Sequence, residues 1–95
     1  MRIINGLTDV PSAGTAVQLS SEGHKVVRIY LYAPAGNTNN VYFGDVNVVS
    51  GNGFILAAGQ RPDPIVFDPG SVLLSNLYVD ADTSGNDLSW IAVVQ

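Results

Sequence analysis

The segment Asp80-Ala81-Asp82-Thr83-Ser84-Gly85 carries the clearest sign of possible chemistry in the sequence. Its acids at positions one and three, hydroxyl at position five and glycine at position six match the first half of a calcium-binding EF-hand loop. Position twelve would be Ile91 instead of the usual glutamate, and the flanking residues resemble strands and not helices. Asp80, Asp82 and Ser84 are therefore a weak candidate Ca²⁺ site, and the simpler interpretation is an acidic hairpin turn.

Residue sets that support catalysis are missing from the chain. His24 is the single histidine and there is no cysteine, so the usual zinc sets and thiol nucleophiles cannot form. A serine triad would need His24 as its base, and no Gly-x-Ser-x-Gly elbow is present. Most of the eight acids lie in turn contexts, where aspartate commonly bonds to backbone, so no glycosidase-like pair is indicated. The sequence predicts no catalytic residue, no cofactor and a surface role for His24.

The composition describes one small apolar domain. A chain of 95 residues allows a single domain, and a hydrophobic fraction of 46% is enough to build a core. A charged fraction of 13% leaves much uncharged surface, some of which is expected to meet a partner. The net charge is −4, and the few cations argue against nucleic acid and anionic membrane as ligands. No apolar stretch approaches the roughly 20 residues of a membrane span, and the first residues do not resemble a signal peptide.

Turn-forming residues divide the chain at short intervals, and between them lie short runs rich in Val, Ile, Tyr and Phe. Helical periodicity is absent. The pattern predicts an all-β fold, a compact antiparallel β-sandwich or barrel of about eight short strands in one domain, residues 1–95. The expected strands cover residues 2–5, 15–19, 25–33, 41–44 with a continuation through 46–49, 54–56, 65–67, 77–81 and 88–94. The last two are expected to form a closing hairpin.

The N-terminal residues are expected to contain one short strand, residues 2–5, followed by a loop. Residues 6–14 contain Asp9, Pro11 and Ser12 and have the composition of a loop. Residues 1–14 are therefore predicted to form an extended arm that reaches across a neighbouring subunit.

The strand expected over residues 25–33 has two different faces. One face is predicted to enter the core with Val27, Ile29 and Leu31, and the other carries Arg28, Tyr30 and Tyr32 together with Val26. A face of arginine and tyrosine is typical of contacts with another protein. The strand at 88–94 is mostly apolar on both faces and is expected to be central or at an interface. The predicted interface residues are Arg28, Tyr30, Tyr32, Tyr42 and Trp90.

Four segments of the sequence form a familiar pattern: Asn40-Val41-Tyr42-Phe43-Gly44-Asp45, Gly53-Phe54-Ile55-Leu56, Asn76-Leu77-Tyr78-Val79-Asp80-Ala81-Asp82 and Leu88-Ser89-Trp90-Ile91-Ala92-Val93. Together they resemble a group of small all-β structural proteins of tailed-phage virions, over roughly residues 15–95. Some proteins of this kind act as capsid decoration, or cement, proteins, which commonly assemble as trimers. No catalytic residue is carried over from the resemblance, because none is known for the group.

The resemblance implies a protein made in the host cytoplasm that binds the major capsid protein, or another virion protein, at the outer capsid surface. It also implies a homo-oligomer, with a trimer favoured. A tail, neck or fibre module is an alternative use of the same surfaces. An alternative of another class is a carbohydrate-binding β-sandwich, in which tyrosine and tryptophan form a platform beside aspartate or asparagine.

Overall fold

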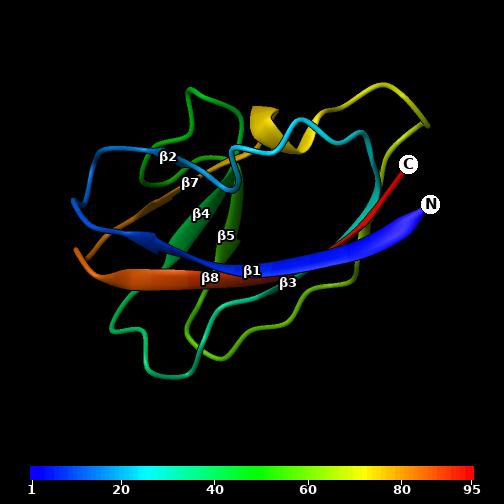
Figure 1. Cartoon of the computed structure of the whole chain (residues 1–95). Helices are drawn as coiled ribbons and strands as arrows, with labels where there is room; N and C mark the ends of the chain where they lie inside the picture. Colours follow the sequence, from blue (N-terminus) through cyan, green and yellow to red (C-terminus); the bar gives the residue numbers. More distant parts are fainter.

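The computed structural model describes residues 1–95, and it is a β-sandwich. One four-stranded sheet has the order β1-β8-β3-β6 and the other has the order β2-β7-β4-β5; we call them the β8 sheet and the β7 sheet (Figure 1). All neighbouring strands are antiparallel. The elements are β1 (Arg2–Val10), β2 (Val17–Gln18), β3 (Val26–Tyr32), β4 (Val41–Gly44), β5 (Phe54–Leu56), β6 (Ile65–Val66), the 3₁₀ helix η1 (Leu74–Asn76), β7 (Tyr78–Ala81) and β8 (Asn86–Val94). The predicted all-β sandwich is confirmed.

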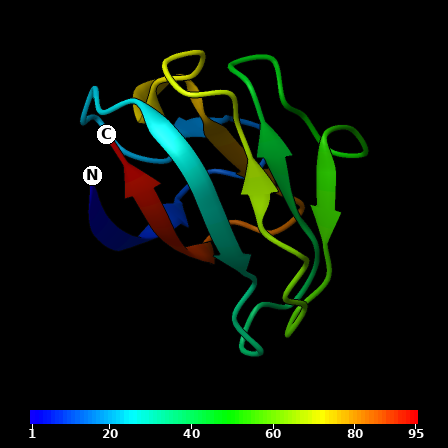
Figure 2. The same ribbon diagram turned by 90° about the vertical axis from the view of Figure 1, so that its right-hand side faces the viewer.

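The core lies between the two sheets and contains 17 buried apolar residues. Figure 2 shows β3 and β8 (cyan and red) side by side, with β4 and β5 (green) across from them. In β8, Leu88, Trp90, Ala92 and Val94 point inward and the alternate residues point outward, as the period of two requires. β8 lies between β1 and β3, so the prediction of a central last strand is also confirmed.

The first strand is longer than the sequence indicated. β1 runs from Arg2 to Val10 and pairs with β8 along its whole length, from Arg2 opposite Val94 to Val10 opposite Asn86. The prediction of a loop beginning at Gly6 is therefore wrong, and residues 2–10 are not a free arm. Gly6 pairs with Trp90 in this strand. The position suits a glycine because the Trp90 ring packs against the backbone, and a Cβ would lie 2.7 Å from Trp90 Cζ2.

A β-bulge changes the expected faces of β3. Val26 pairs with Val94 and Arg28 with Val93, so one residue is inserted between the two pairs. Val26 is therefore buried together with Ile29 and Leu31, whereas Val27 is only half-buried. The prediction for Val26 and Val27 is wrong for this reason, and beyond the bulge the alternation is as expected.

The closing hairpin is not formed. β7 pairs with β2 and β4, and β8 pairs with β1 and β3, so the connection after Ala81 crosses from one sheet to the other. β7 and β8 each have an apolar face that enters the core. In facing sheets these two faces pack against each other. The continuation of β4 through residues 46–49 is also absent, because the chain turns there.

The β4–β5 turn depends on a glycine that no other residue replaces easily. Gly53 has φ +69°, and a Cβ on it would lie 2.5 Å from the Phe43 carbonyl oxygen. We expect Gly53→Ala to lower the free energy of unfolding by about 3 kcal/mol, because it combines left-handed strain with a backbone clash. Gly51→Ala is the control in the same turn. Its φ is +89°, but no atom lies within 4 Å of the added Cβ. We therefore expect the free energy of unfolding to fall by only about 1–2 kcal/mol. Equal losses in urea unfolding would contradict this account.

Candidate binding surface

The three residues of the candidate Ca²⁺ site are not arranged as a common ligand set. Asp80 is fully buried, and its Oδ1 accepts hydrogen bonds from the backbone N–H groups of Gly14 (3.0 Å) and Ala81 (2.8 Å). Ser84 Oγ accepts the backbone N–H of Ala13 at 2.9 Å, and the Asp82 carboxylate accepts two hydroxyl groups. The structure contains no group of three or more histidine, cysteine or acidic side chains placed to hold a metal. These oxygens instead serve donors of the chain itself.

Asp82, which follows β7, is linked by side-chain hydrogen bonds to the β4–β5 turn and to β4. Its carboxylate accepts the Ser50 and Tyr42 hydroxyl groups, both at 2.6 Å, and these bonds hold the pKa of Asp82 below its ordinary value of 3.8. The ionised carboxylate therefore stabilises the fold at a pH above 3.8, and this contribution is lost as the pH falls through the folded pKa.

We therefore expect Asp82→Asn to lower the melting temperature at neutral pH and to have a smaller effect at about pH 2, because protonation of the wild-type carboxyl increases as the pH falls. Thermal unfolding followed by circular dichroism at both pH values measures this. The control is Asp68→Asn, which removes an exposed carboxylate that has no side-chain hydrogen bond. A melting-temperature difference that persists unchanged at low pH would contradict the ionic explanation.

The outward side of the β8 sheet is an exposed apolar surface, which we call the β8 face. The strand registers place its residues in rows across the sheet. The first row is Ile3–Val93–Arg28–Val66, the second is Asn5–Ile91–Tyr30, and the third is Leu7–Ser89–Tyr32. Five large apolar side chains of this face are between 40% and 69% exposed: Ile3, Leu7, Tyr30, Val66 and Ile91. Contiguous apolar surface of this kind on a small domain commonly marks an interaction site.

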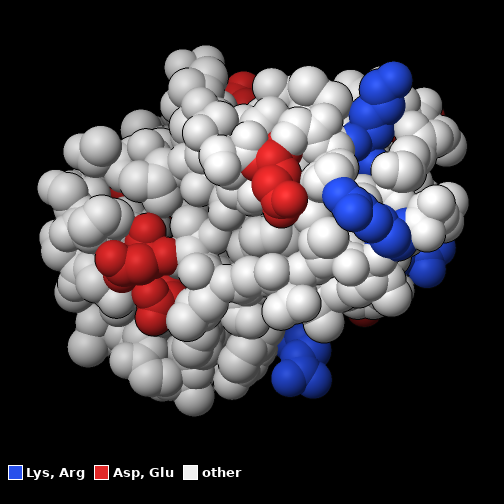
Figure 3. Space-filling view, in the orientation of Figure 1, with Lys and Arg blue, Asp and Glu red and all other residues white.

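The β8 face is charged at its ends, with opposite signs. Arg28 lies in the first row, and its only side-chain hydrogen bond is to the Tyr30 hydroxyl at 3.4 Å. Asp9 and Asp87 lie directly opposite each other beyond the third row. No lysine or arginine pairs with a carboxylate, and the one histidine–carboxylate contact of the chain, His24–Glu22, involves neither end. Figure 3 shows acidic side chains gathered over the end of β1 and the start of β8, and basic ones toward the side of the chain termini.

The acidic end of the β8 face disfavours the folded state at neutral pH. Partial burial, together with the neighbouring Asp9 carboxyl, raises the pKa of Asp87 above 3.8. A raised folded pKa means that the protonated form favours folding below the unfolded pKa, and this contribution is lost as the pH rises through the folded pKa. We expect Asp87→Asn to raise the melting temperature at neutral pH in dilute solution, and to have little effect at about pH 2. A lower melting temperature at neutral pH would contradict this, and differential scanning calorimetry measures it.

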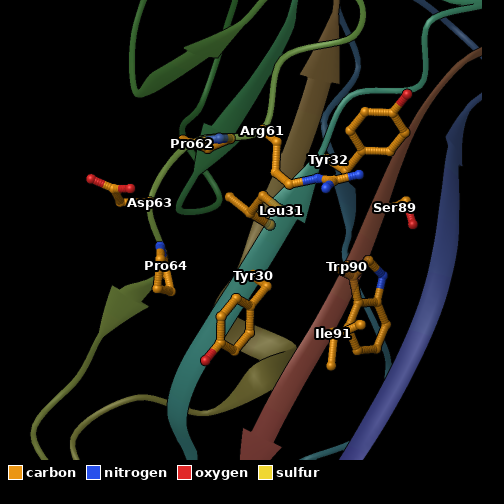
Figure 4. Close-up of a pocket in the computed structure, with 10 residues that line it drawn as sticks. All are labelled: Tyr30, Leu31, Tyr32, Arg61, Pro62, Asp63, Pro64, Ser89, Trp90 and Ile91. Carbon is orange, nitrogen blue, oxygen red and sulfur yellow. The ribbon is translucent and has the colours of Figure 1, made fainter.

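A groove of about 620 Å³ lies on the β8 face beside the segment that leads into β6 (Figure 4). The Arg61 guanidinium stacks on the Tyr32 ring, 5.0 Å from its centroid. The groove combines an aromatic wall, a cation, an acid and a small hydroxyl side chain. It is lined by Tyr30, Leu31, Tyr32, Arg61, Pro62, Asp63, Pro64, Ser89, Trp90 and Ile91.

Only some of the predicted interface residues come together. Arg28, Tyr30 and Tyr32 lie on the β8 face. Tyr42 belongs to the β7 sheet and is 4% exposed, and Trp90 points inward and is 5% exposed, so neither side chain offers a face to a partner. Their inclusion is corrected by the packing. Ile3 and Leu7 were not predicted as interface residues. Leu7 falls in the loop expected over residues 6–14, and Ile3 in the short strand expected over residues 2–5; their spacing of four along β1 was the available signal.

A second group of exposed apolar residues belongs to the β4–β5 hairpin. Phe54 and Ile55 lie on β5, and Val46 and Val49 lie in the turn before it; each is between 49% and 59% exposed. We call these four residues the hairpin patch. Ile55 pairs with Tyr42 and so belongs to the β7 sheet, opposite the β8 face in the sandwich.

Comparisons of the chain with family models, curated proteins and solved structures find no match. Within the fold, no helix has the length and apolar character needed to cross a membrane.

Proposed function

We propose that this protein is a non-enzymatic structural subunit, a phage capsid decoration protein that binds the outer capsid lattice and stabilises the particle. The observation that carries the proposal is the presence of two exposed apolar surfaces, the β8 face and the hairpin patch, on different sheets of one small sandwich. An assembly subunit needs two such surfaces, because it contacts the lattice through one and a neighbouring subunit through the other. A bound subunit stabilises the assembled lattice through its higher affinity for that state.

Self-association belongs to this proposal. A twofold dimer uses one patch twice, whereas a trimer joins two different patches of neighbouring copies head to tail. Either scheme is available here, because one surface can meet its own copy or the β8 face can meet the hairpin patch of a neighbour. The oligomeric order therefore depends on how the charges of the meeting surfaces match.

Co-sedimentation with capsids assembled without the protein tests the proposal. We expect the wild-type chain at micromolar concentration to pellet with capsids of the phage that encodes it. Ile55→Asp should lower that binding at least about tenfold, because it places a charge in the apolar contact. Ser21→Asp is the matched control, since it adds the same charge at an exposed loop residue that belongs to neither surface. Absence of the wild-type chain from the pellet would reject capsid decoration, and binding to purified tails would assign it to the tail.

The groove favours a second candidate function, carbohydrate binding. Aromatic side chains beside a few polar groups are the usual composition of a small-molecule site, and here Tyr30 lies near Arg61 and Asp63. Trp90 is the single tryptophan and borders the groove, so its fluorescence is a probe of occupancy. Saturable fluorescence changes with sugars that an Asp63→Ala variant loses would support this function. A blank glycan array would reject it.

A further inference from the structure

We infer that the β8 face binds the β8 face of a second copy of this chain, in a twofold dimer whose facing strands run in opposite directions. The inference concerns the chain alone and does not depend on which partner the hairpin patch binds.

The shape and composition of the β8 face suit another sheet. Its rows alternate with the buried residues of the same strands, so it is as regular as the inner face of the sandwich. Two sheets with apolar facing sides commonly pack about 10 Å apart with their strands aligned to within about 30°. A second copy supplies such a sheet and would cover the five exposed apolar side chains of each face at once.

The charges of the β8 face indicate a copy of the chain in the reversed direction. Arg28 at one end has no carboxylate partner, and the Asp9–Asp87 pair at the other end has no cation. Two like charges directly opposite each other in a sheet are unfavourable, so this pair gains from a cation supplied in trans. Reversing one face places the acidic end of each copy toward the basic end of the other. The parallel arrangement would instead bring Arg28 near Arg28 and acid near acid.

The rows also fix a register in which apolar residues meet. With the twofold axis near Ile91, the Ile91 side chains of the two copies face each other at the centre. Ile3 of one copy then lies opposite Leu7 of the other, and Arg28 lies opposite Tyr32. Asp87 of the other copy lies one row further, about 7 Å along the strand, and one strand to the side, about 5 Å, so the Arg28 side chain must extend toward it across the interface. This register centres the contact on Ile91 and leaves the acids at the rim.

Chemical cross-linking tests this register directly, because the chain has no cysteine. Ile91→Cys should give a cross-linked dimer with a short bis-maleimide, since sheets about 10 Å apart are too distant for a direct disulfide. Val46→Cys is the matched control, as it places a thiol on the hairpin patch at a residue that is at least as exposed as Ile91. Cross-linking of Ile91→Cys alone supports the dimer. Equal cross-linking of both variants, or none for Ile91→Cys, would overturn it.

A charge exchange tests the reversed direction. Arg28→Asp and Asp87→Arg should each weaken the dimer at least tenfold in analytical ultracentrifugation, and the double variant should recover most of the loss. Circular dichroism confirms that each variant remains folded. A wild-type chain that is monomeric at about 100 µM, or trimeric by native mass spectrometry, would overturn the inference. Capsid binding of Ile55→Asp is scored separately, so failure of the dimer is distinguishable from failure of the decoration proposal.

Discussion

Replacing Gly6 with valine is expected to lower the free energy of unfolding by about 2–3 kcal/mol, through overpacking against a ring that cannot move away. A Cβ at Gly6 would lie 2.7 Å from Trp90 Cζ2 and 3.0 Å from Trp90 Cε2. The ring is held in the core and its Nε1–H donates to Thr8 Oγ1 at 3.0 Å. A domain of this length has a total stability of roughly 5–14 kcal/mol, so the loss is a large share.

The matched control for this change is Gly36→Val. Gly36 lies in an exposed loop, has no positive φ and would place its Cβ more than 4 Å from any other group. Urea unfolding followed by Trp90 fluorescence measures both variants, and the Gly6→Val spectrum should also shift because the ring environment changes. Similar stabilities for the two variants would show that Trp90 has room to adjust, against the close contact described above.

Asp80→Ala is expected to cost about 2–4 kcal/mol, because it removes the shared acceptor of two backbone donors. Oδ1 of this buried side chain accepts from Gly14 in the β1–β2 connection and from Ala81 in β7. The bond to Gly14 joins residues 66 positions apart and holds the β1–β2 connection against the β7 sheet. Without it, the amide of Gly14 should also exchange with solvent much faster.

Asp80→Asn separates the hydrogen bonds from the charge. The amide keeps an oxygen acceptor for both donors, and the other carboxyl oxygen, Oδ2, has no partner in the wild-type structure. We therefore expect Asp80→Asn to remain within about 1 kcal/mol of wild type. Urea unfolding together with amide exchange at Gly14 measures both variants. A loss for asparagine as large as that for alanine would mean that the carboxyl group itself, and not only its acceptor oxygen, is required at this position.

The parts of the fold that could be predicted are those where local pattern and burial agree. The apolar character of both faces of the last strand correctly indicated a central position, because β8 lies between β1 and β3 and one of its sides faces the core along its whole length. The strands β4 and β5 were placed correctly, because turn residues bound them closely. These elements are specified by neighbours in the sequence.

The errors arise where a distant partner decides the structure. Gly6 and Asp9 resemble turn residues, yet β8 pairs with both and extends β1 past them. The bulge at Val26 depends on the register with β8, which local alternation does not encode. The loop after Ala81 has hairpin composition, but only the packing of two sheets reveals that β7 and β8 belong to different layers.

Only part of the β8 face could be predicted from the sequence, for the same reason. The β3 residues Arg28, Tyr30 and Tyr32 follow from one strand, so the sequence identified them. The remaining rows come from β1, β8 and β6, and only the registers between strands show that Ile3, Ile91 and Val66 complete the face.

The position of β8 at the centre of its sheet has a consequence for synthesis. β1 leaves the ribosome before the other strands of the domain, but its sheet partner is β8, the last of them. The delay between them is roughly 4–15 s at ordinary rates of translation. During this interval β1 has no neighbour, and its isoleucines and Leu7 are available to the β1 of another nascent chain. A truncated chain that ends before Asn86 would therefore lack the strand that joins β1 to β3. We expect such a chain to be degraded or to aggregate.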